Sequence, residues 1–242
     1  MRKFGGLTAV AGISMDIPPG QVTGLIGPNG AGKTTVVNLI SGLLKATEGT
    51  IRLGERDVTT ADAVTLAKAG VARTFQNIRL IPHATALENV LAGFHLRERT
   101  GLLANLLALP AARRERADLE AEALALMRAF GMDRWAATQA GNLSYGHQRK
   151  IEMMRALALQ PKVLLLDEPV AGMNDVEAAG LAETFRTVAR QGVAILLIEH
   201  NMRFVMSLCD RIYVLASGRM IAEGEPDAVR NNPHVIEAYL GA

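Results

Sequence analysis

The stretch Gly27-Pro28-Asn29-Gly30-Ala31-Gly32-Lys33-Thr34 decides the fold of this chain. It matches the pattern G-x-x-x-x-G-K-[ST], in which a glycine-rich loop joins a strand to a helix and wraps phosphate groups. A short apolar run, 22–26, precedes the loop, and apolar residues with a helical period follow it from Val36 to Leu44. The sequence therefore predicts a strand, a phosphate loop and a helix in this order.

The loop residues are candidates for binding the phosphates of a nucleotide. Glycines let the backbone curl, so that successive N–H groups point at phosphate oxygens, and the helix N-terminus adds a partial positive charge. We expect Lys33 to contact the β- and γ-phosphates and the Thr34 hydroxyl to be a ligand of Mg²⁺. The candidate residues are Asn29, Gly30, Ala31, Gly32, Lys33, Thr34 and Thr35.

Two adjacent carboxylates, Asp167 and Glu168, follow the apolar run 163–166. The run predicts a buried strand, and ligands of open α/β sheets bind at the carboxyl ends of the strands. Because consecutive strand residues face opposite sides, the two carboxylates can divide their work. We expect Asp167 to contribute to the Mg²⁺ site and Glu168 to face an attacking water.

The remaining chain predicts a P-loop (RecA-like) α/β fold with a mostly parallel sheet. Apolar runs at 163–166 and 193–198 alternate with helical segments, while Arg211–Ala216 and Arg219–Ala222 predict an antiparallel hairpin. Between Thr85 and about Gln160 nearly all residues favour helix, including a capping box of Thr85 and Glu88 and a helix from Leu119 to Met127.

The expected organisation is one domain over residues 1–242. Its core comprises residues 1–80 and 157–242, an all-helical subdomain covers 81–156, and a small part is antiparallel.

Composition excludes several classes of protein. The 242 residues include 26 Lys+Arg and 24 Asp+Glu, so that the net charge of +2 does not indicate a nucleic-acid binder. The single cysteine, Cys209, excludes an internal disulfide and a cysteine-based zinc cluster and favours a reducing compartment. No apolar stretch approaches the ~20 residues of a membrane span, and no signal peptide is expected.

The segment Leu143-Ser144-Tyr145-Gly146-His147-Gln148 precedes an apolar helix. By itself it predicts a helix start capped by Ser144. Together with the phosphate loop and the two carboxylates, it resembles the LSGGQ signature of the nucleotide-binding subunits of ABC transporters. Further matching positions along the chain are Phe4, Gln76 and His200, and Ala171–Asn174 stands where the D-loop of the family lies.

The resemblance implies a role for each of these residues. Phe4 would stack on adenine, Gln76 would be the Q-loop ligand of Mg²⁺, and His200 would contact the γ-phosphate and hold the attacking water with Glu168. Ser144 and Gly146 would close over ATP bound to a second subunit. The sequence departs from the family pattern at Tyr145, His147 and Asn174, and these departures put the signature and D-loop contacts in question.

The nearer resemblance is to the ATP-binding subunits of branched-chain amino-acid importers. It rests on four segments, which are 4–10, 72–80, 235–241 and the long insert 95–116. It implies an ATPase with ATP and Mg²⁺ as cofactors, peripheral on the cytoplasmic face of the inner or plasma membrane. The implied partners are transmembrane permease subunits, an identical or paralogous second ATP-binding subunit and, indirectly, a periplasmic or extracellular solute-binding protein; nucleic acid is not among them.

Other functions remain open from the residues. Similar subunits serve urea, amides or lipopolysaccharide export, and some ABC ATPases act without a transporter in DNA repair or translation. A P-loop kinase would lack the signature and His200, and a GTPase would carry an Asn-Lys-x-Asp motif that this sequence lacks.

The stretch 97–116 has a pattern of its own. Five arginines against two glutamates give it a net charge of +3 around a leucine-rich centre. One interpretation is a solvated helical hairpin whose leucines pack on the helical subdomain, and the other is contact with a membrane partner or anionic lipid headgroups.

Overall fold

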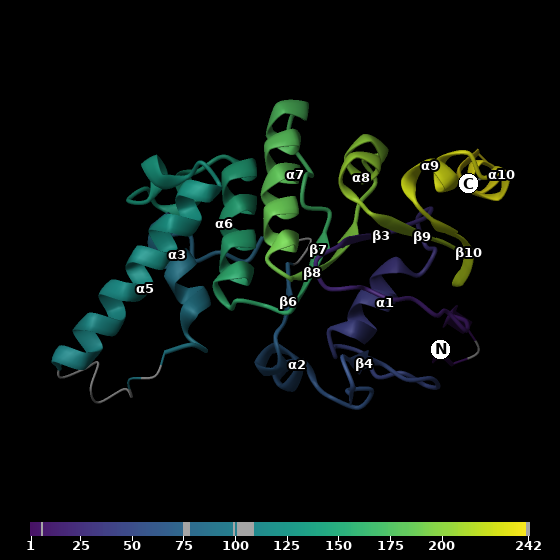
Figure 1. Cartoon of the computed structure of the whole chain (residues 1–242), viewed down its shortest axis with the longest axis horizontal. Coiled ribbons are helices and arrows are strands. Elements are labelled where there is room, and N and C mark those ends of the chain that lie inside the picture. The colour runs from purple at the N-terminus through teal and green to yellow at the C-terminus, as the bar shows by residue number, and fades with distance from the viewer. Residues whose placement is uncertain (6, 75–77, 99, 101–108, 241–242) are drawn as a thin grey trace. The chain divides into compact units, whose positions relative to one another are not determined.

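The computed structural model describes residues 1–5, 7–74, 78–98, 100 and 109–240, in two compact units (Figure 1). The sheet unit comprises Met1–Arg73, Lys162–Val170 and Asp175–Ala242. The helical unit comprises Thr74–Pro161 and Ala171–Asn174. The single-domain organisation with a helical subdomain at 81–156 stays a prediction.

A six-stranded sheet with the order β10-β9-β3-β8-β7-β6 forms the centre of the sheet unit. Five neighbouring strands run parallel, and β10 is antiparallel to β9. The carboxyl ends of parallel strands meet at one edge, so residues far apart in the sequence converge there. The strands are β3 (Val22–Ile26), β6 (Val71–Arg73), β7 (Val163–Asp167), β8 (Ala194–Ile198), β9 (Arg211–Ala216) and β10 (Arg219–Gly224).

Helices cover both faces of this sheet, with α1 on one face and α7 and α8 on the other (Figure 1). Val36 and Val37 of α1 pack in a core cluster with Leu25, Leu165 and Leu196 from three strands. The helices of the sheet unit are α1 (Lys33–Ile40), α2 (Ala63–Ala69), α7 (Asp175–Arg190), α8 (Met202–Leu208), α9 (Pro226–Arg230) and α10 (Pro233–Leu240).

Two small antiparallel ribbons complete the sheet unit. The first pairs β1 (Arg2–Phe4) with β2 (Leu7–Val10), and the second pairs β4 (Arg52–Leu53) with β5 (Arg56–Asp57). The mostly parallel α/β sheet with small antiparallel parts confirms the predicted fold class. The predicted hairpin is also confirmed as β9 and β10, although β10 extends two residues farther than expected.

The helical unit contains α3 (Ala86–Leu91), α5 (Pro110–Ala129) and α6 (Tyr145–Ala158), with short 3-10 helices at Ala92–Phe94, Asp133–Trp135 and Ala140–Asn142. The predicted capping box is confirmed, because the Thr85 side chain accepts from the Glu88 N–H and the Glu88 side chain accepts from the Thr85 N–H. The predicted helix from Leu119 to Met127 was too short. Pro110 starts α5, because proline suits the first helical position, where no N–H is needed.

Candidate nucleotide-binding site

The phosphate loop connects β3 to α1, as predicted, and two of its glycines have no substitute. Gly27 has φ 146°, and a Cβ there would collide with the carbonyl oxygen of Leu215. Gly32 has φ 101°, and its Cβ would lie 2.7 Å from the carbonyl oxygen of Ala9. The loop is therefore held between β9 and β2, where only glycine fits at these positions.

The start of α1 suits an anion. Among the described residues no side chain caps this helix end, and its first turn contains no acidic residue. The N-terminal N–H groups and the helix dipole therefore favour a bound negative group. Thr34 is exposed and Thr35 half-buried at this end.

The remaining loop residues differ in exposure. Asn29 and Gly30 are exposed at the tip of the loop. Ala31 is buried, and its N–H donates to the carbonyl of Pro28 at 3.2 Å.

Lys33 lies inside the loop that precedes it. Its Nζ donates to the carbonyl oxygens of Gly27 at 2.7 Å and Pro28 at 2.9 Å, and the residue is 7% exposed. Burial lowers the pKa of the Lys33 ammonium, and the nearby Glu168 and Asp167 carboxylates raise it in part. The structure therefore brings the predicted phosphate-binding cation close to the two predicted carboxylates.

The two carboxylates diverge, but not for the reason expected from strand alternation. Asp167 is the last residue of β7 and its Oδ2 accepts from Arg73 Nη2 at 3.2 Å. Glu168 lies beyond the strand with φ 49°, a left-handed conformation that costs a non-glycine residue about 1–2 kcal/mol. The Glu168 N–H donates to Ile198 at 2.9 Å, which helps to hold this turn. The turn, and not the pleat, sets the direction of the Glu168 side chain.

Glu168 and His200 contact each other at the ends of adjacent strands. His200 Nε2 lies 3.0 Å from Glu168 Oε1, and the His200 side chain is 45% exposed. The structure therefore brings together the Glu168 carboxylate, which was predicted to face the attacking water, and the His200 imidazole, which was predicted to contact the γ-phosphate.

Glu199 is a residue of this site that sequence reasoning missed. It is 4% exposed, and its carboxylate accepts from the N–H groups of Val170 at 3.1 Å, His200 at 2.8 Å and Asn201 at 3.1 Å. These charge-assisted bonds tie the loop after β7 to the loop after β8. The only sequence signal was a carboxylate directly after a buried apolar strand.

Ser144 caps α6 in the helical unit, as predicted. Its Oγ accepts from the His147 N–H at 3.4 Å, and the residue is exposed. Gly146 lies in the first turn of the helix, where an added Cβ would be 3.8 Å from Met173. Tyr145 packs against Gly172, whose φ of 74° is left-handed. The unusual tyrosine therefore contacts the predicted D-loop within the same unit.

His147, the second departure in the signature, contacts Trp135 with its ring tilted. The two ring centroids are 5.2 Å apart with an interplanar angle of 43°. The histidine thus contributes an aromatic contact at the start of α6.

The structure does not describe the side chains of two residues that were predicted to bind the nucleotide or Mg²⁺. Phe4 lies in β1, where the backbone alone is described, and Gln76 lies outside the described residues. Their assigned roles in adenine stacking and Mg²⁺ binding stay predictions.

Residues 10–171 match the protein family described as ABC transporter. The chain belongs to the ABC transporter family. Residues 219–242 of this ABC protein also match a family described as Branched-chain amino acid ATP-binding cassette transporter. Family membership excludes the P-loop kinase alternative and supports ATP as the bound nucleotide.

The chain is also similar to named ABC proteins along its full length. The high-affinity branched-chain amino acid transport ATP-binding protein LivG of Salmonella typhimurium is 44% identical over 242 residues, covering 100% of this chain and 95% of LivG.

Two solved ABC cassettes have the same fold. The ADP conformation of the cassette MJ1267 has a TM-score of 0.86 at 33% identity, covering 100% of this chain and 96% of that one. A dimeric post-hydrolysis state of the cassette MJ0796, bound to ADP and Pi, has a TM-score of 0.77 at 25% identity. The match covers 93% of this chain and 94% of that one.

Helices long and apolar enough to cross a membrane do not occur in the part of this ABC chain that the structure describes. In the arginine-rich stretch, Arg97 pairs with Glu122 at 2.8 Å, and Thr100 bonds to Glu115. Arg113, Arg114 and Arg116 are exposed on α5. The leucines at 102, 103, 106 and 107 lie outside the described residues, so the two interpretations of this stretch stay open.

Proposed function

We propose that this chain is the ATP-hydrolysing subunit of an ABC importer that takes up branched-chain amino acids. The observation that carries the proposal is the 44% identity to LivG along the full chain, together with the match of residues 219–242 to a branched-chain amino acid cassette family. The C-terminal match matters because it lies outside the segment 10–171 that matches ABC transporters in general.

At the phosphate loop, Lys33 neutralises phosphate charge while the backbone N–H groups before α1 orient the nucleotide. Thr34, Gln76 and Asp167 hold Mg²⁺ in this proposal, since hydroxyl, amide and carboxylate oxygens are ligands that Mg²⁺ accepts. When bound, the ion would supply neutralisation of phosphate charge. A buried Asp167 at the strand end and an exposed Thr34 at the helix start fit such a site.

Glu168 polarises the attacking water in this proposal, and His200 holds the water and Glu168 in line with the γ-phosphate. The 3.0 Å contact between Glu168 and His200 supports this division of roles. Catalysis is then mostly positioning and charge neutralisation, as is general for phosphoryl transfer. Phe4 stacks on the adenine.

Two copies of the chain, or one copy and a paralogue, would bind two nucleotides between them. Ser144 and Gly146 would contact the nucleotide bound by the other subunit. The dimeric cassette MJ0796 supports this arrangement, because its chain is similar over 93% of this one. Permease subunits in the membrane and an external solute-binding protein complete the proposed importer, and this chain lies peripherally on the cytoplasmic face.

Transport by the assembled complex tests the proposal. The tagged chain is purified with its membrane partners, reconstituted into liposomes with ATP inside, and supplied with labelled leucine, isoleucine or valine. We expect ATP-dependent uptake of these solutes and competition among them. Uptake of urea or amides in their place, or ATPase activity that responds to nucleic acid and not to membrane partners, would favour the other functions.

A further inference from the structure

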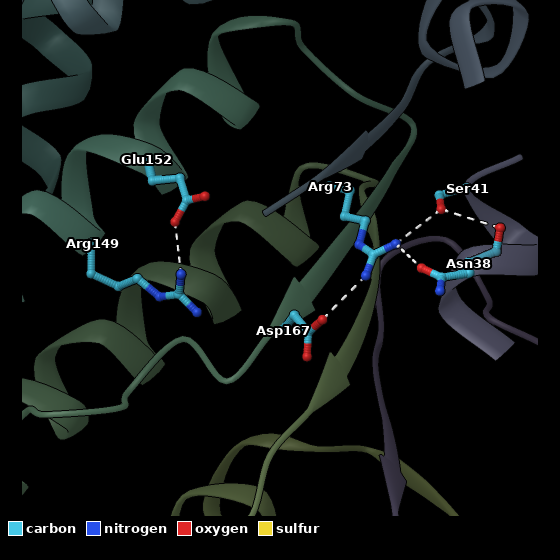
Figure 2. Close-up of polar contacts among 6 residues, drawn as sticks. All are labelled: Asn38, Ser41, Arg73, Arg149, Glu152 and Asp167. Carbon is cyan, nitrogen blue, oxygen red and sulfur yellow. Dashed lines mark hydrogen bonds and ion pairs between the residues drawn. The ribbon is translucent and has the colours of Figure 1, made fainter. Parts of the chain in front are cut away.

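One buried guanidinium joins three elements beside the proposed Mg²⁺ site (Figure 2). Arg73 is the last residue of β6, and its side chain is 9% exposed. Its Nη2 donates to Asp167 Oδ2 of β7 at 3.2 Å. Its Nη1 donates to Asn38 Oδ1 at 2.6 Å and to Ser41 Oγ at 3.2 Å, at the far end of α1. Arg73 thus links β6, β7 and α1 through side chains alone.

The α1 partners of Arg73 lie on the face of the helix that carries Thr34. Asn38 and Ser41 follow Thr34 by four and seven residues, and this spacing places side chains above one another on a helix. Thr34 is therefore connected to Arg73 through one face of α1, and Asp167 is connected to it through an ion pair.

We propose that Arg73 is a positioning residue that holds the Asp167 carboxylate at a fixed distance from the Thr34 face of α1. The inference rests on the proposed function, because it assigns Thr34 and Asp167 to one Mg²⁺ site. Arg73 does not itself bind the ion. It sets the geometry in which the two ligands meet the ion.

The planar guanidinium is what makes this arrangement possible. Its nitrogens point in fixed directions, so Nη1 can bond to α1 while Nη2 bonds to Asp167. A lysine keeps the positive charge but has one compact ammonium on a flexible stem, which cannot span both partners in the same way. Removing a side chain that hydrogen-bonds to a metal ligand commonly lowers the affinity for the metal by about 10–100-fold.

The variant Arg73→Lys separates positioning from charge. ATPase rate is measured against MgCl₂ concentration at fixed ATP, and binding of a fluorescent ATP analogue is titrated with MgCl₂ and again with EDTA. We expect the MgCl₂ concentration for half-maximal activity to rise by about tenfold. Binding of the analogue in Mg²⁺ weakens by a similar factor, while its binding in EDTA and the thermal unfolding temperature stay close to those of the original chain.

A second variant keeps Arg73 and removes one of its anchors. Asn38→Ala leaves every charge in place. We expect the MgCl₂ concentration for half-maximal activity to rise here too, but by less than in Arg73→Lys. Arg211→Lys is the matched control, because Arg211 pairs with Glu223 at 2.9 Å on the β9–β10 hairpin and, among the described residues, makes no hydrogen bond or ion pair with Arg73 or Asp167. Its MgCl₂ dependence should equal that of the original chain.

Three results would overturn the inference. Unchanged MgCl₂ dependence in Arg73→Lys would mean that charge alone matters, and equal weakening in Mg²⁺ and EDTA would mean a general structural role. If Arg73→Lys does not fold, unchanged MgCl₂ dependence in Asn38→Ala decides against it. Failure of the proposed function is distinct, because the original chain would then show no Mg²⁺-dependent ATP hydrolysis.

Discussion

Two buried arginine–carboxylate pairs, one in each unit, differ in what they join (Figure 2). Arg73 and Asp167 are 94 residues apart in the sequence and connect two strands, with further bonds to α1. Arg149 and Glu152 are three residues apart on α6, with Nη1 and Oε2 at 2.7 Å, and Arg149 has no exposed surface.

A buried ion pair can join separate elements of a fold or lie within a single helix, and the two pairs differ in this respect. The pair in the sheet unit joins two strands, and its arginine also bonds to α1, whereas the pair in the helical unit lies within one turn of helix. Both pairs lose their hydration on burial, and this loss makes an unpaired charge costly in either place. Charge removal in the sheet unit should therefore change chemistry first, and charge removal in the helical unit should change stability first.

The largest effect is expected at Glu168, next to the sheet-unit pair. Glu168→Gln should lower the turnover of ATP by about a thousandfold, because an amide cannot accept a proton from the attacking water. ATP binding should persist, since the phosphate loop is unchanged. Phosphate release and equilibrium binding of a fluorescent ATP analogue measure the two properties. Near-normal turnover would remove Glu168 from the role of water-polarising base.

The second effect concerns the helical-unit pair. Arg149→Met should lower the free energy of unfolding by about 3–5 kcal/mol, because the buried Glu152 carboxylate loses the guanidinium that lies 2.7 Å away. Urea denaturation followed by circular dichroism measures this loss. The double variant Arg149→Met/Glu152→Leu should recover most of it, since apolar groups replace both charges.

A matched control is Arg97→Met, which breaks the more exposed pair with Glu122. The side chains of this pair are 25% and 46% exposed, so we expect a loss of at most about 1 kcal/mol. If the double variant at 149 and 152 is as unstable as the single one, the pair is needed for more than mutual charge compensation.

The smallest effect is expected at the capping box of α3, where the charges face water. Thr85→Ala should lower the free energy of unfolding by about 1 kcal/mol at neutral pH, because the Glu88 N–H loses its acceptor. The same urea experiment measures it. A loss as large as that of Arg149→Met would contradict the distinction between buried and exposed charges.

This capping effect should also depend on pH. Hydrogen bonds from the backbone and side chain of Thr85 lower the pKa of Glu88 from its ordinary value of 4.5. A lowered pKa in the folded state contributes stability that is present above the unfolded pKa and is lost as the pH falls through the folded pKa. The difference between Thr85→Ala and the original chain should therefore narrow as the pH is lowered below 4.5, in urea titrations at several pH values.

Local patterns predicted much of this protein. The strand at 22–26, the capping box at Thr85 and the cap at Ser144 each depend on residues within a few positions of one another. Pro110 shows a limit of such patterns, because proline can interrupt a helix or start one, and only the surrounding structure decides. Glu168 shows another, since alternation ends where the strand ends, and a left-handed turn follows.

By itself the sequence determined the phosphate loop, the paired carboxylates and the periodic apolar segments that form the sheet and helices. These patterns are short-range, and each one depends only on the local geometry of the backbone. Tertiary structure alone decided that Arg73 reaches Asp167 and α1, and that Glu199 ties two loops together. These contacts join segments from separate strands, and no local pattern in the chain shows which strand ends will become neighbours until the parallel sheet aligns them.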